Sequence, residues 1–258
     1  MWIVLRVATL NVCGLPPLLS RLPPLDRRAA AFGRVVEDSD VDVFNVQEVW
    51  GRRALGALRR ALPSFPHVAF VPTSGGGPSG GLVTFSRTPT GRPAFHSFRG
   101  TAPRTSTALF RARRALNARR QGILSVPLDG AHVVNTHLTS NRDGDWTTES
   151  RYYQFHCDQL DRLHSVIQGA SVVTGDFNIA ADSPLYPRLV GDWHDPFAES
   201  DPITYHPEFL PAGARGHRID YVLTRGDATA AEVLFAERLP SVGWASDHLG
   251  LAATVLPG

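Results

Sequence analysis

Six short polar motifs, spread over the whole chain, carry the side chains whose types and spacing could do chemistry. Each motif ends or directly follows an apolar run, which is where a buried strand delivers a side chain to the edge of a sheet. The motifs are TLN at Asn11, QEV at Glu48, NTHL at His137, GDFN at Asp176 and Asn178, RIDY at Asp220, and SDH at Asp247 and His248. Carboxylates, amides and two histidines in one pocket would suit a hard divalent cation and a phosphate ester.

Glu48 is the predicted primary ligand of the cation, since it follows a predicted buried strand over 41–46. Asn11, at the end of the first predicted strand, offers a neutral oxygen beside it, and Asp247 is predicted to face the metal or a structural water. Mg²⁺ prefers oxygen ligands and keeps several waters, and Mn²⁺ or Ca²⁺ could use the same groups. The sequence has no HExxH motif and no CxxC pair, which argues against a zinc site.

The GDFN motif is the most specific of the six. Asp176 can orient or deprotonate a water, and Asn178 can hold a phosphoryl oxygen without adding negative charge. Gly175 is expected to allow a tight turn after a short strand over 171–174. An isolated Asp-Phe-Asn commonly forms only a local Asx turn, so the functional interpretation depends on the other five motifs.

Two histidines are expected to complete the site. His137 is predicted to stabilise charge that develops on the phosphoryl oxygens. His248 follows Asp247, but neighbours along a strand point to opposite faces, so the carboxylate that orients His248 is predicted to be Asp220. Such a carboxylate would favour the imidazolium and fix its tautomer.

Strands dominate the elements that must position these side chains. The predicted helices are 26–37, 52–62 and 149–167. The predicted strands are 2–12, 41–46, 67–71, 82–85, 131–136, 171–174, 219–223 and 249–256, with further strands within 92–128 around an arginine-rich loop at 111–120. Helices do not alternate strictly with strands, which favours two sheets packed face to face with helices outside.

The whole chain reads as one globular domain over 1–258, because no linker, repeat or low-complexity tract divides it. The net charge of +2 argues against a dedicated polyanion binder, and all 26 basic residues are arginine. Cys13 and Cys157 are predicted to be separate buried thiols, with a single bridge as the alternative.

No apolar run reaches the ~18 residues of a membrane span, and the chain begins with a predicted strand. These features predict a soluble monomer, cytoplasmic as the chain stands. A secreted protein whose leader has been removed would show the same features.

In this order the six motifs resemble those of the endonuclease/exonuclease/phosphatase superfamily, also called the deoxyribonuclease-like fold. Within it the sequence is most similar to the neutral sphingomyelinases, in the stretches NVCGLPPLLS, VQEVWGRRALGALRRAL, SGGLVTFSRTP, NTHLTSN, GHRIDYVL and WASDHLGLAATV. The NTHL motif favours this branch, because abasic-site endonucleases usually carry Y-x-P-N at that stage. The resemblance implies a four-layer αββα sandwich of two packed mixed β-sheets flanked by helices, and a Mg²⁺-dependent phosphoric diester hydrolase.

The resemblance also implies how the residues divide the work. Glu48 would bind the metal with help from Asn11, and Asp247 would lie near the metal side. The remaining motif residues are implied to be catalytic: Asp176 positions or activates the attacking water, Asn178 orients water or phosphate, His137 stabilises the transition state, and His248, paired with Asp220, acts in acid–base catalysis or charge stabilisation.

Two departures from the family pattern bear on the substrate. The superfamily often places a lysine before the glycine of the mid-chain strand, whereas Gln121 precedes Gly122 here. Secreted bacterial sphingomyelinases carry an aromatic membrane-inserting hairpin between the last two motifs, but residues 224–246 contain only Phe235 and Trp244 as aromatic side chains. A soluble phosphodiester or a lysolipid therefore competes with bilayer sphingomyelin as the expected substrate.

The predicted reaction is hydrolysis of a choline-type or similar head-group phosphodiester by direct attack of water. Trp146, Arg151 and Tyr152 are the predicted substrate contacts, and Trp146 could pack on a quaternary ammonium by cation–π attraction. Simple packing at the entry of the following helix is the alternative for Trp146.

Three other functions remain open. A nuclease could contact phosphates through Arg99, Arg104, Arg111, Arg113, Arg114, Arg119 and Arg120, although the small net charge disfavours nucleic acid as partner. A phosphatase acting on a sugar or inositol phosphate could use the same metal site. A catalytically silent binding module would be expected to have lost at least one of the motifs.

Overall fold

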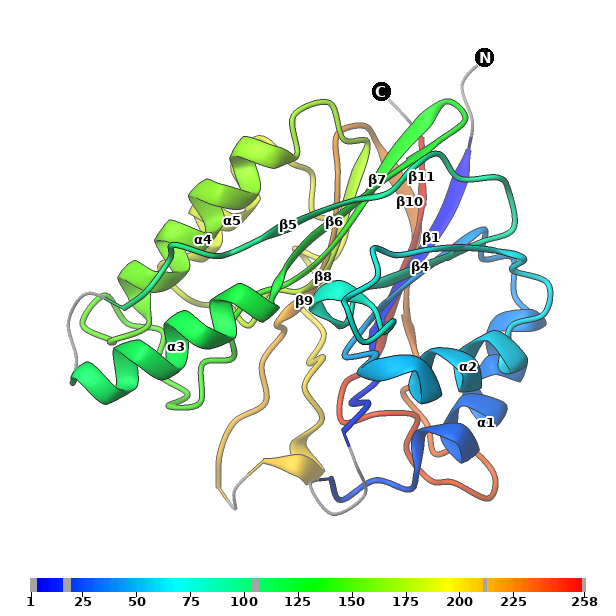
Figure 1. The fold of residues 1–258 in the computed structure, drawn as a ribbon, viewed down its shortest axis with the longest axis horizontal. Helices are drawn as coiled ribbons and strands as arrows, with labels where there is room; N and C mark the ends of the chain where they lie inside the picture. The colour runs from blue at the N-terminus through cyan, green and yellow to red at the C-terminus, as the bar shows by residue number, and fades with distance from the viewer. Residues whose placement is uncertain (1–3, 16–19, 104–106, 211–212, 257–258) are drawn as a thin grey trace.

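Two β-sheets stack face to face, with helices on both outer surfaces (Figure 1). This computed structural model describes residues 4–15, 20–103, 107–210 and 213–256. The arrangement confirms the predicted four-layer sandwich of two mixed sheets. Trp2 and Ile3 of the first predicted strand, and Arg104 of the arginine-rich region, lie outside the described residues.

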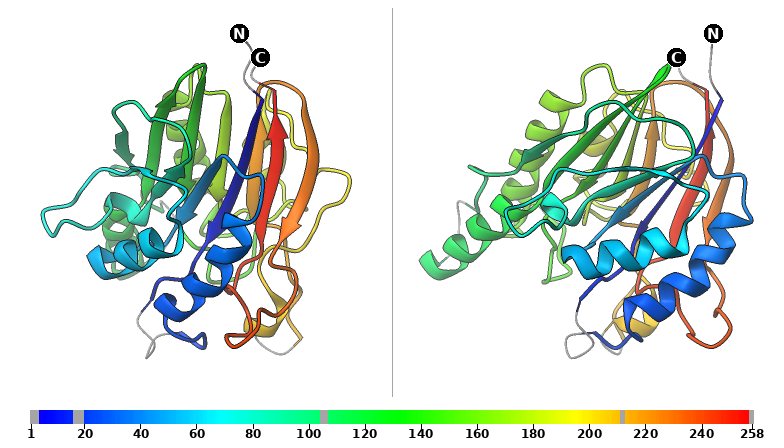
Figure 2. Two further views of the ribbon diagram at one scale, coloured as in Figure 1. Left: turned by 90° about the vertical axis from the view of Figure 1, so that its right-hand side faces the viewer. Right: turned by 45° about the vertical axis from the view of Figure 1, so that its right-hand side comes forward.

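The larger sheet has six strands in the order β10-β11-β1-β2-β4-β3. They are β1 (Leu5–Asn11), β2 (Val43–Gln47), β3 (His67–Ala69), β4 (Val83–Ser86), β10 (Ala228–Leu234) and β11 (Gly250–Val255). Only β1 and β2 pair in parallel. Helices α1 (Leu25–Glu37) and α2 (Gly51–Ala61) cover the outer face of this sheet (Figure 2), where Phe32, Leu58 and Phe44 share one core cluster.

The smaller sheet has five strands in the order β5-β6-β7-β8-β9. They are β5 (Ala94–Ser97), β6 (Gly122–Leu128), β7 (Ala131–His137), β8 (Val172–Asp176) and β9 (Asp220–Thr224), of which only β7 and β8 are parallel. The helices on its side are α3 (Ala108–Arg120), α4 (Tyr153–Val166) and α5 (Tyr186–Val190). Leu160 and Leu163 of α4 are buried against Val134 and Val173 of the sheet, in a second core cluster.

Along the central strands, the side chains that face the opposite sheet change from apolar to polar in one direction. The sets are Leu5, Val7, Thr9 and Asn11 in β1; Val43, Asn45 and Gln47 in β2; Val133, Asn135 and His137 in β7; and Val172, Thr174 and Asp176 in β8. The apolar members share a third core cluster between the sheets. The polar members bond across the layer, with Gln47 Nε2 donating to Asn135 Oδ1 at 2.7 Å and Asn45 Nδ2 to Thr174 Oγ1 at 2.8 Å.

The arginine-rich segment is a helix, so the loop predicted at 111–120 was wrong. Helix α3 begins after Thr107, whose side chain accepts a hydrogen bond from the backbone N–H of Phe110 at 3.3 Å. Alanine, leucine and arginine have the highest intrinsic helix propensities, and this segment consists mainly of them. Strand β10 and the short helix α5 were not predicted at all.

Gly175 lies inside β8, so the turn predicted there was also wrong. Its φ is +143°, and a Cβ at this position would lie 1.9 Å from the carbonyl oxygen of Thr136 in β7. Glycine is needed for the two parallel strands to approach each other where His137 pairs in register with Asp176.

Two predictions about the whole chain can be checked against the described residues. Cys13 and Cys157 are both free and buried, as predicted. Among the described helices, none has both the length and the apolar composition needed to cross a membrane.

Candidate active site

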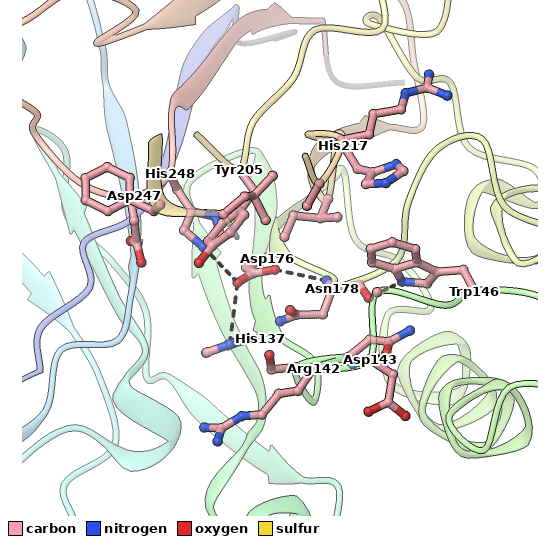
Figure 3. A pocket seen from close by; sticks show the side chains of 18 of the residues that line it. His137, Arg142, Asp143, Trp146, Asp176, Asn178, Tyr205, His217, Asp247 and His248 are labelled. Carbon is pink, nitrogen blue, oxygen red and sulfur yellow. Dashed lines mark hydrogen bonds and ion pairs between the residues drawn. The ribbon is translucent and has the colours of Figure 1, made fainter. Parts of the chain in front are cut away.

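A cavity of about 710 Å³ opens at the polar end of the layer between the sheets (Figure 3). Six residues from the motifs line it together: Glu48, His137, Asp176, Asn178, Asp247 and His248. Asn11 and Asp220 lie directly behind this lining and are hydrogen-bonded to it. The fold thus gathers all eight side chains that the motifs singled out.

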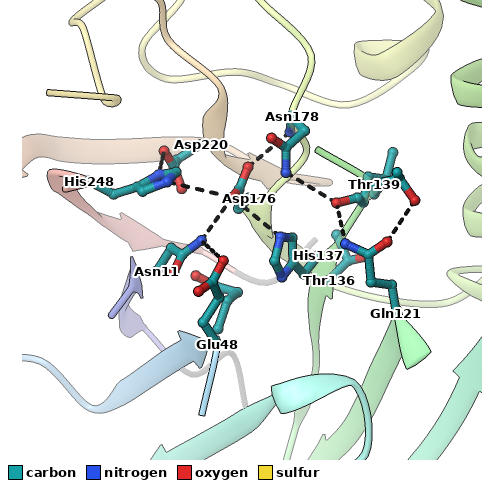
Figure 4. A network of polar contacts seen from close by, with 12 residues as sticks. Asn11, Glu48, Gln121, Thr136, His137, Thr139, Asp176, Asn178, Asp220 and His248 are labelled. Carbon is teal, nitrogen blue, oxygen red and sulfur yellow. Dashed lines mark hydrogen bonds and ion pairs between the residues drawn. The ribbon is translucent and has the colours of Figure 1, made fainter. Parts of the chain in front are cut away.

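Asp176 lies at the centre of the site (Figure 4). Its Oδ2 accepts a hydrogen bond from Asn11 Nδ2 at 2.9 Å and lies 3.5 Å from His137 Nε2 and 3.8 Å from His248 Nε2. Burial raises the pKa of Asp176; the charge of His248 opposes this rise and that of Asp220 adds to it, leaving the pKa raised. A carboxylate with a raised pKa is a stronger base than an exposed aspartate, which suits the removal of a proton from water.

His248 forms a buried ion pair with Asp220, across 2.9 Å between Nδ1 and Oδ2. Burial alone would lower the pKa of His248, but the charges of Asp220 and Asp176 outweigh it and hold the pKa well above its ordinary value. These carboxylates favour the imidazolium form of His248, whose Nε2 lies on the side of Asp176. The contact with Asp220 is the one that strand alternation predicted, and Asp247 lines the pocket separately.

Hydrogen bonds fix the amide of Asn178. Its backbone is left-handed, with φ +53°, and its N–H donates to Asp176 Oδ1 at 2.9 Å. Its Nδ2 donates to the carbonyl oxygen of Leu138 at 3.1 Å, and since a carbonyl can only accept, this contact sets the orientation of the amide. Oδ1 is left without a donor among the described residues, so it suits a hydrogen of water better than a phosphoryl oxygen.

A chain of hydrogen bonds holds the loop after β7 that carries Leu138 (Figure 4). Gln121 Nε2 donates to the Leu138 carbonyl at 3.0 Å, and Gln121 Oε1 accepts from Thr139 Oγ1 at 2.6 Å. Gln159 Nε2 of α4 donates to the same Thr139 hydroxyl at 2.9 Å. Gln121 thus positions the backbone that orients Asn178.

The donor set at the opposite side of the pocket fits a hard cation. Glu48, with φ +61°, and Asp247 are half-buried and line the pocket together. Burial and then the charges of Asp247 and Glu48 raise the pKa of the Cys13 thiol to about 12. This concentration of negative charge, on carboxylate oxygens that face the pocket, is what a divalent cation would neutralise.

Asn11 is oriented differently from the expectation, in which its amide oxygen lay beside the metal. Oδ1 accepts a hydrogen bond from the backbone N–H of Cys13 at 3.0 Å. Because that N–H can only donate, Nδ2 must face the carboxylates, and it lies 3.4 Å from Glu48 Oε1 and 2.9 Å from Asp176 Oδ2. Asn11 therefore holds the two carboxylates apart and in place.

A second set of ligand atoms is less suitable for a metal. Oxygen and nitrogen atoms of Asp176, Asp220 and His248 lie within 4.8 Å of one another. His248 is already bonded to Asp220, and Asp176 already accepts hydrogen bonds at both oxygens. A cation there would have to replace these hydrogen-bond donors, so the carboxylates of Glu48 and Asp247 suit a cation better.

The predicted substrate contacts divide into one in the pocket and two outside it. Trp146 lines the pocket, donates from Nε1 to the carbonyl of Asn178 at 2.9 Å, and packs on His217 with ring centroids 4.7 Å apart. Arg151 is not among the lining residues and forms a two-bond ion pair with Asp143. Tyr152 is only 1% exposed and belongs to the core under α4, so its prediction as a contact was wrong.

Sequence reasoning missed much of the pocket wall. Tyr205, Phe209, Arg142 and Arg215 all line it. The ring of Tyr205 meets that of His248 edge-on at 5.0 Å, through a bridge between the two backbones. No polar motif marks these positions, because a pairing between residues 43 apart in sequence brings Tyr205 here.

A buried arginine ties together the loops on the Glu48 side. Arg28 of α1 is 1% exposed, and its Nη1 donates to the carbonyls of Val12 at 2.8 Å and Ala245 at 2.6 Å. Its Nη2 donates to Cys13 at 2.9 Å, and its Nε to Pro23 at 2.8 Å. The segments that follow β1 and precede β11 are thereby fixed relative to each other.

The sequence profile described as the Endonuclease/Exonuclease/phosphatase family matches residues 8–248. The chain belongs to this family. Members of the family are metal-dependent phosphoesterases and phosphodiesterases, so the protein is a phosphoric ester hydrolase that depends on a divalent metal. A search of curated proteins found no match.

Solved structures share the family fold at low sequence identity. A Staphylococcus aureus beta toxin double mutant with bound magnesium ions is 16% identical, with a TM-score of 0.71 over 98% of this chain and 100% of that one. Sphingomyelinase C from Streptomyces griseocarneus is 17% identical, with a TM-score of 0.68 over 98% and 99%. Humanized D. rerio TDP2 is 18% identical, with a TM-score of 0.69 over 97% and 98%.

Proposed function

We propose that the protein is a Mg²⁺-dependent phosphodiesterase that cleaves a phosphocholine-like head group, or a related small phosphodiester, from an alcohol. The observation that carries this proposal is the single pocket in which Asp176, Asn178 and two histidines face Glu48 and Asp247. The beta toxin structure with bound magnesium and sphingomyelinase C share the fold and support the choice of metal and substrate class.

In this proposal water attacks phosphorus directly. Asp176 accepts a proton from the water, while Asn178 Oδ1 orients it. His137 and the protonated His248 stabilise the charge on the phosphoryl oxygens. The bond from phosphorus to the alcohol breaks, and the alcohol takes up a proton from solvent. Mg²⁺ held by Glu48 and Asp247 supplies further charge neutralisation when bound.

The aromatic lining of the pocket favours a substrate whose head group carries an organic cation. Trp146, Tyr205, Phe209 and His217 contribute aromatic rings to the wall of the cavity. A quaternary ammonium can bind to aromatic faces by cation–π attraction. Indole Nε1 of Trp146 is already bonded to Asn178, so a head group on its ring would lie next to the attacking water.

A panel of substrates tests the proposal. Purified protein with Mg²⁺ should release phosphocholine from sphingomyelin, lysophosphatidylcholine or p-nitrophenyl phosphocholine, and chelation of the metal should abolish the release. Absence of turnover on all three esters, with nicking of plasmid DNA under the same conditions, would reject the phosphocholine assignment in favour of a nuclease.

The nuclease alternative has one observation in its favour. Arg142 and Arg215 line the pocket and are exposed, so they could contact a second phosphate of a polyanion. The arginines of α3 support it less, since Arg114 is only 9% exposed and lies over the ring of Phe110. Steep loss of DNA binding with rising salt, at unchanged turnover of small esters, would point to this function.

A further inference from the structure

A second cavity, of about 340 Å³, lies between the first turns of α1 and α2. We call it the α1–α2 groove. The buried side chains of Leu25 and Ala57 form its floor, and Trp50 and Ala54 line its side. Its volume is within the range of about 300–1,000 Å³ that is usual for small-molecule sites.

Two large apolar side chains of the groove are exposed, and one of them, Trp50, is packed in place. Leu15 is 38% exposed and Trp50 is 37% exposed. The Trp50 ring packs on Gly81 so closely that a Cβ there would lie 3.0 Å from the ring. Exposed apolar side chains that gather around one groove indicate a site for an apolar ligand.

The groove and the active-site pocket are neighbouring cavities that share Leu15 in their linings. The groove lies beside Glu48, since its lining residue Gly14 packs against the Glu48 backbone so closely that a Cβ there would lie 2.1 Å from the Glu48 carbonyl oxygen. The charged groups of the groove, Asp26 and Arg53, pair with each other at 3.7 Å and are both partly exposed.

The direction of the proposed reaction decides which part of a substrate reaches the α1–α2 groove. The attacking and leaving oxygens must lie roughly in line on opposite sides of phosphorus. Asp176 and Asn178, which would hold the water, lie at the end of β8 of the smaller sheet and just beyond it. The leaving oxygen therefore points toward Glu48 and the larger sheet, where the groove begins.

We infer that the α1–α2 groove binds the aliphatic part of the leaving alcohol. The inference rests on the proposed function and names its substrate class, phosphodiesters of long-chain alcohols. The phosphoryl group and its head group occupy the polar pocket, and the chain passes Leu15 and lies along Trp50 and Ala54.

Calorimetric binding of n-alkyl phosphates, from butyl to decyl, tests the groove without requiring turnover. With Mg²⁺ present and below micelle-forming concentrations, the wild-type Kd should fall at least about tenfold across the series, since each fully buried methylene contributes up to about fourfold. Ala54→Phe fills the groove and should reduce the fall in Kd from butyl to decyl phosphate to less than about threefold. The Kd for butyl phosphate should be unaffected. Ala115→Phe, at a half-buried alanine of α3 that lines neither cavity, should behave as wild type.

A Kd that is the same across the series in the wild type, or an equal chain-length dependence in Ala54→Phe, would overturn the inference. If Ala54→Phe fails to fold by circular dichroism, Trp50→Ser serves instead, because it removes the outer wall and should also weaken the dependence. Failure of the proposed function shows itself separately, as absence of phosphocholine release from every ester in the panel.

Discussion

The layer between the two sheets has two ends that are built by the same strands. One end is apolar and tightly packed, and the other is polar and lines the pocket. At the end away from the pocket, the central strands contribute Leu5, Val43, Val133 and Val172, which pack together. Four to six residues further along, the same strands contribute Asn11, Gln47, His137 and Asp176. A slip of one residue would turn all of these side chains to the opposite face, so the apolar end fixes the register of the polar one.

Under the proposed mechanism, the residues that stabilise the fold and those that catalyse the reaction occupy opposite ends of the same strands. Apolar packing supplies most of the favourable free energy of folding. Buried hydrogen bonds contribute little net but specify a unique arrangement. Asn135 shows this second function, since its Nδ2 donates to the carbonyls of Val46 and Val83 at 3.1 Å and its Oδ1 accepts from Gln47. The predictions below test the separation, from the largest expected effect to the smallest.

Asp176→Asn should lower kcat by about 10²–10⁴-fold, because an amide cannot take the proton from water. The variant should remain folded by circular dichroism. Asp192→Asn, at an exposed aspartate outside the pocket, is the matched control and should keep full activity. Near-normal turnover by Asp176→Asn would remove Asp176 from the proposed mechanism.

Phe197→Ala should lower the free energy of unfolding by about 3–5 kcal/mol, measured by urea denaturation, because it leaves a cavity in the apolar end. Phe197 is 2% exposed and belongs to the cluster between the sheets. The folded fraction should keep the kcat of the wild type. A loss of kcat comparable to that of Asp176→Asn would show that the two ends are not separable.

His156 should make the free energy of unfolding fall as the pH is lowered. It is buried behind the polar end, donates from Nε2 to the Thr139 carbonyl at 2.8 Å, and burial lowers its pKa to about 4. The unfolded chain, with a histidine pKa near 6.5, binds more protons below that pH, so stability is full above about pH 6.5 and falls toward pH 4.

The expected loss from His156 is about 3 kcal/mol between pH 7 and pH 4, and His156→Gln should lack this part of the pH dependence. Urea denaturation at both pH values measures it, with His194→Gln, at an exposed histidine, as control. The same acid sensitivity in His156→Gln and wild type would contradict the assignment.

Gln47→Leu and Val43→Ala make the most direct comparison, because both residues belong to β2 and face the opposite sheet. Each should cost about 1–3 kcal/mol of stability, the first by removing the donor to Asn135 Oδ1 and the second by leaving a void. Only Gln47→Leu should also lower kcat, by several-fold, because Asn135 precedes His137 on the same face of β7. Equal kcat values in the two variants would contradict the separation.

Much of the site could be predicted because strands deliver side chains in a regular way. The apolar runs before Asn11, Glu48, His137 and Asp176 marked strand ends. Alternation excluded Asp247 as the partner of His248 and so pointed to Asp220 of the RIDY strand, which the structure confirms. The gradient of alternate residues, such as Val133, Asn135 and His137, is legible in the sequence and would have marked the inward faces.

What could not be predicted depends on contacts between distant segments. The amide of Asn178 takes its orientation from the carbonyl of Leu138, 40 residues away in sequence, which no local pattern reveals. Gly175 was interpreted as a turn because the sequence does not show how closely β7 approaches. Tyr205 reaches the pocket wall only through its long-range pairing with His248. Tyr152 was assigned to the pocket because, in the sequence, the start of an amphipathic helix cannot be told apart from the border of a cleft.

Arg28 places a positive charge near the two carboxylates of Glu48 and Asp247. Its guanidinium binds carbonyl oxygens rather than a carboxylate, so its positive charge remains available to Glu48 and Asp247, whose fields reach it. A lysine, with one ammonium in place of a planar fork, could not span the same four carbonyls. If Glu48 and Asp247 hold the metal as proposed, this charge would lower their mutual repulsion and keep the site assembled before an ion arrives.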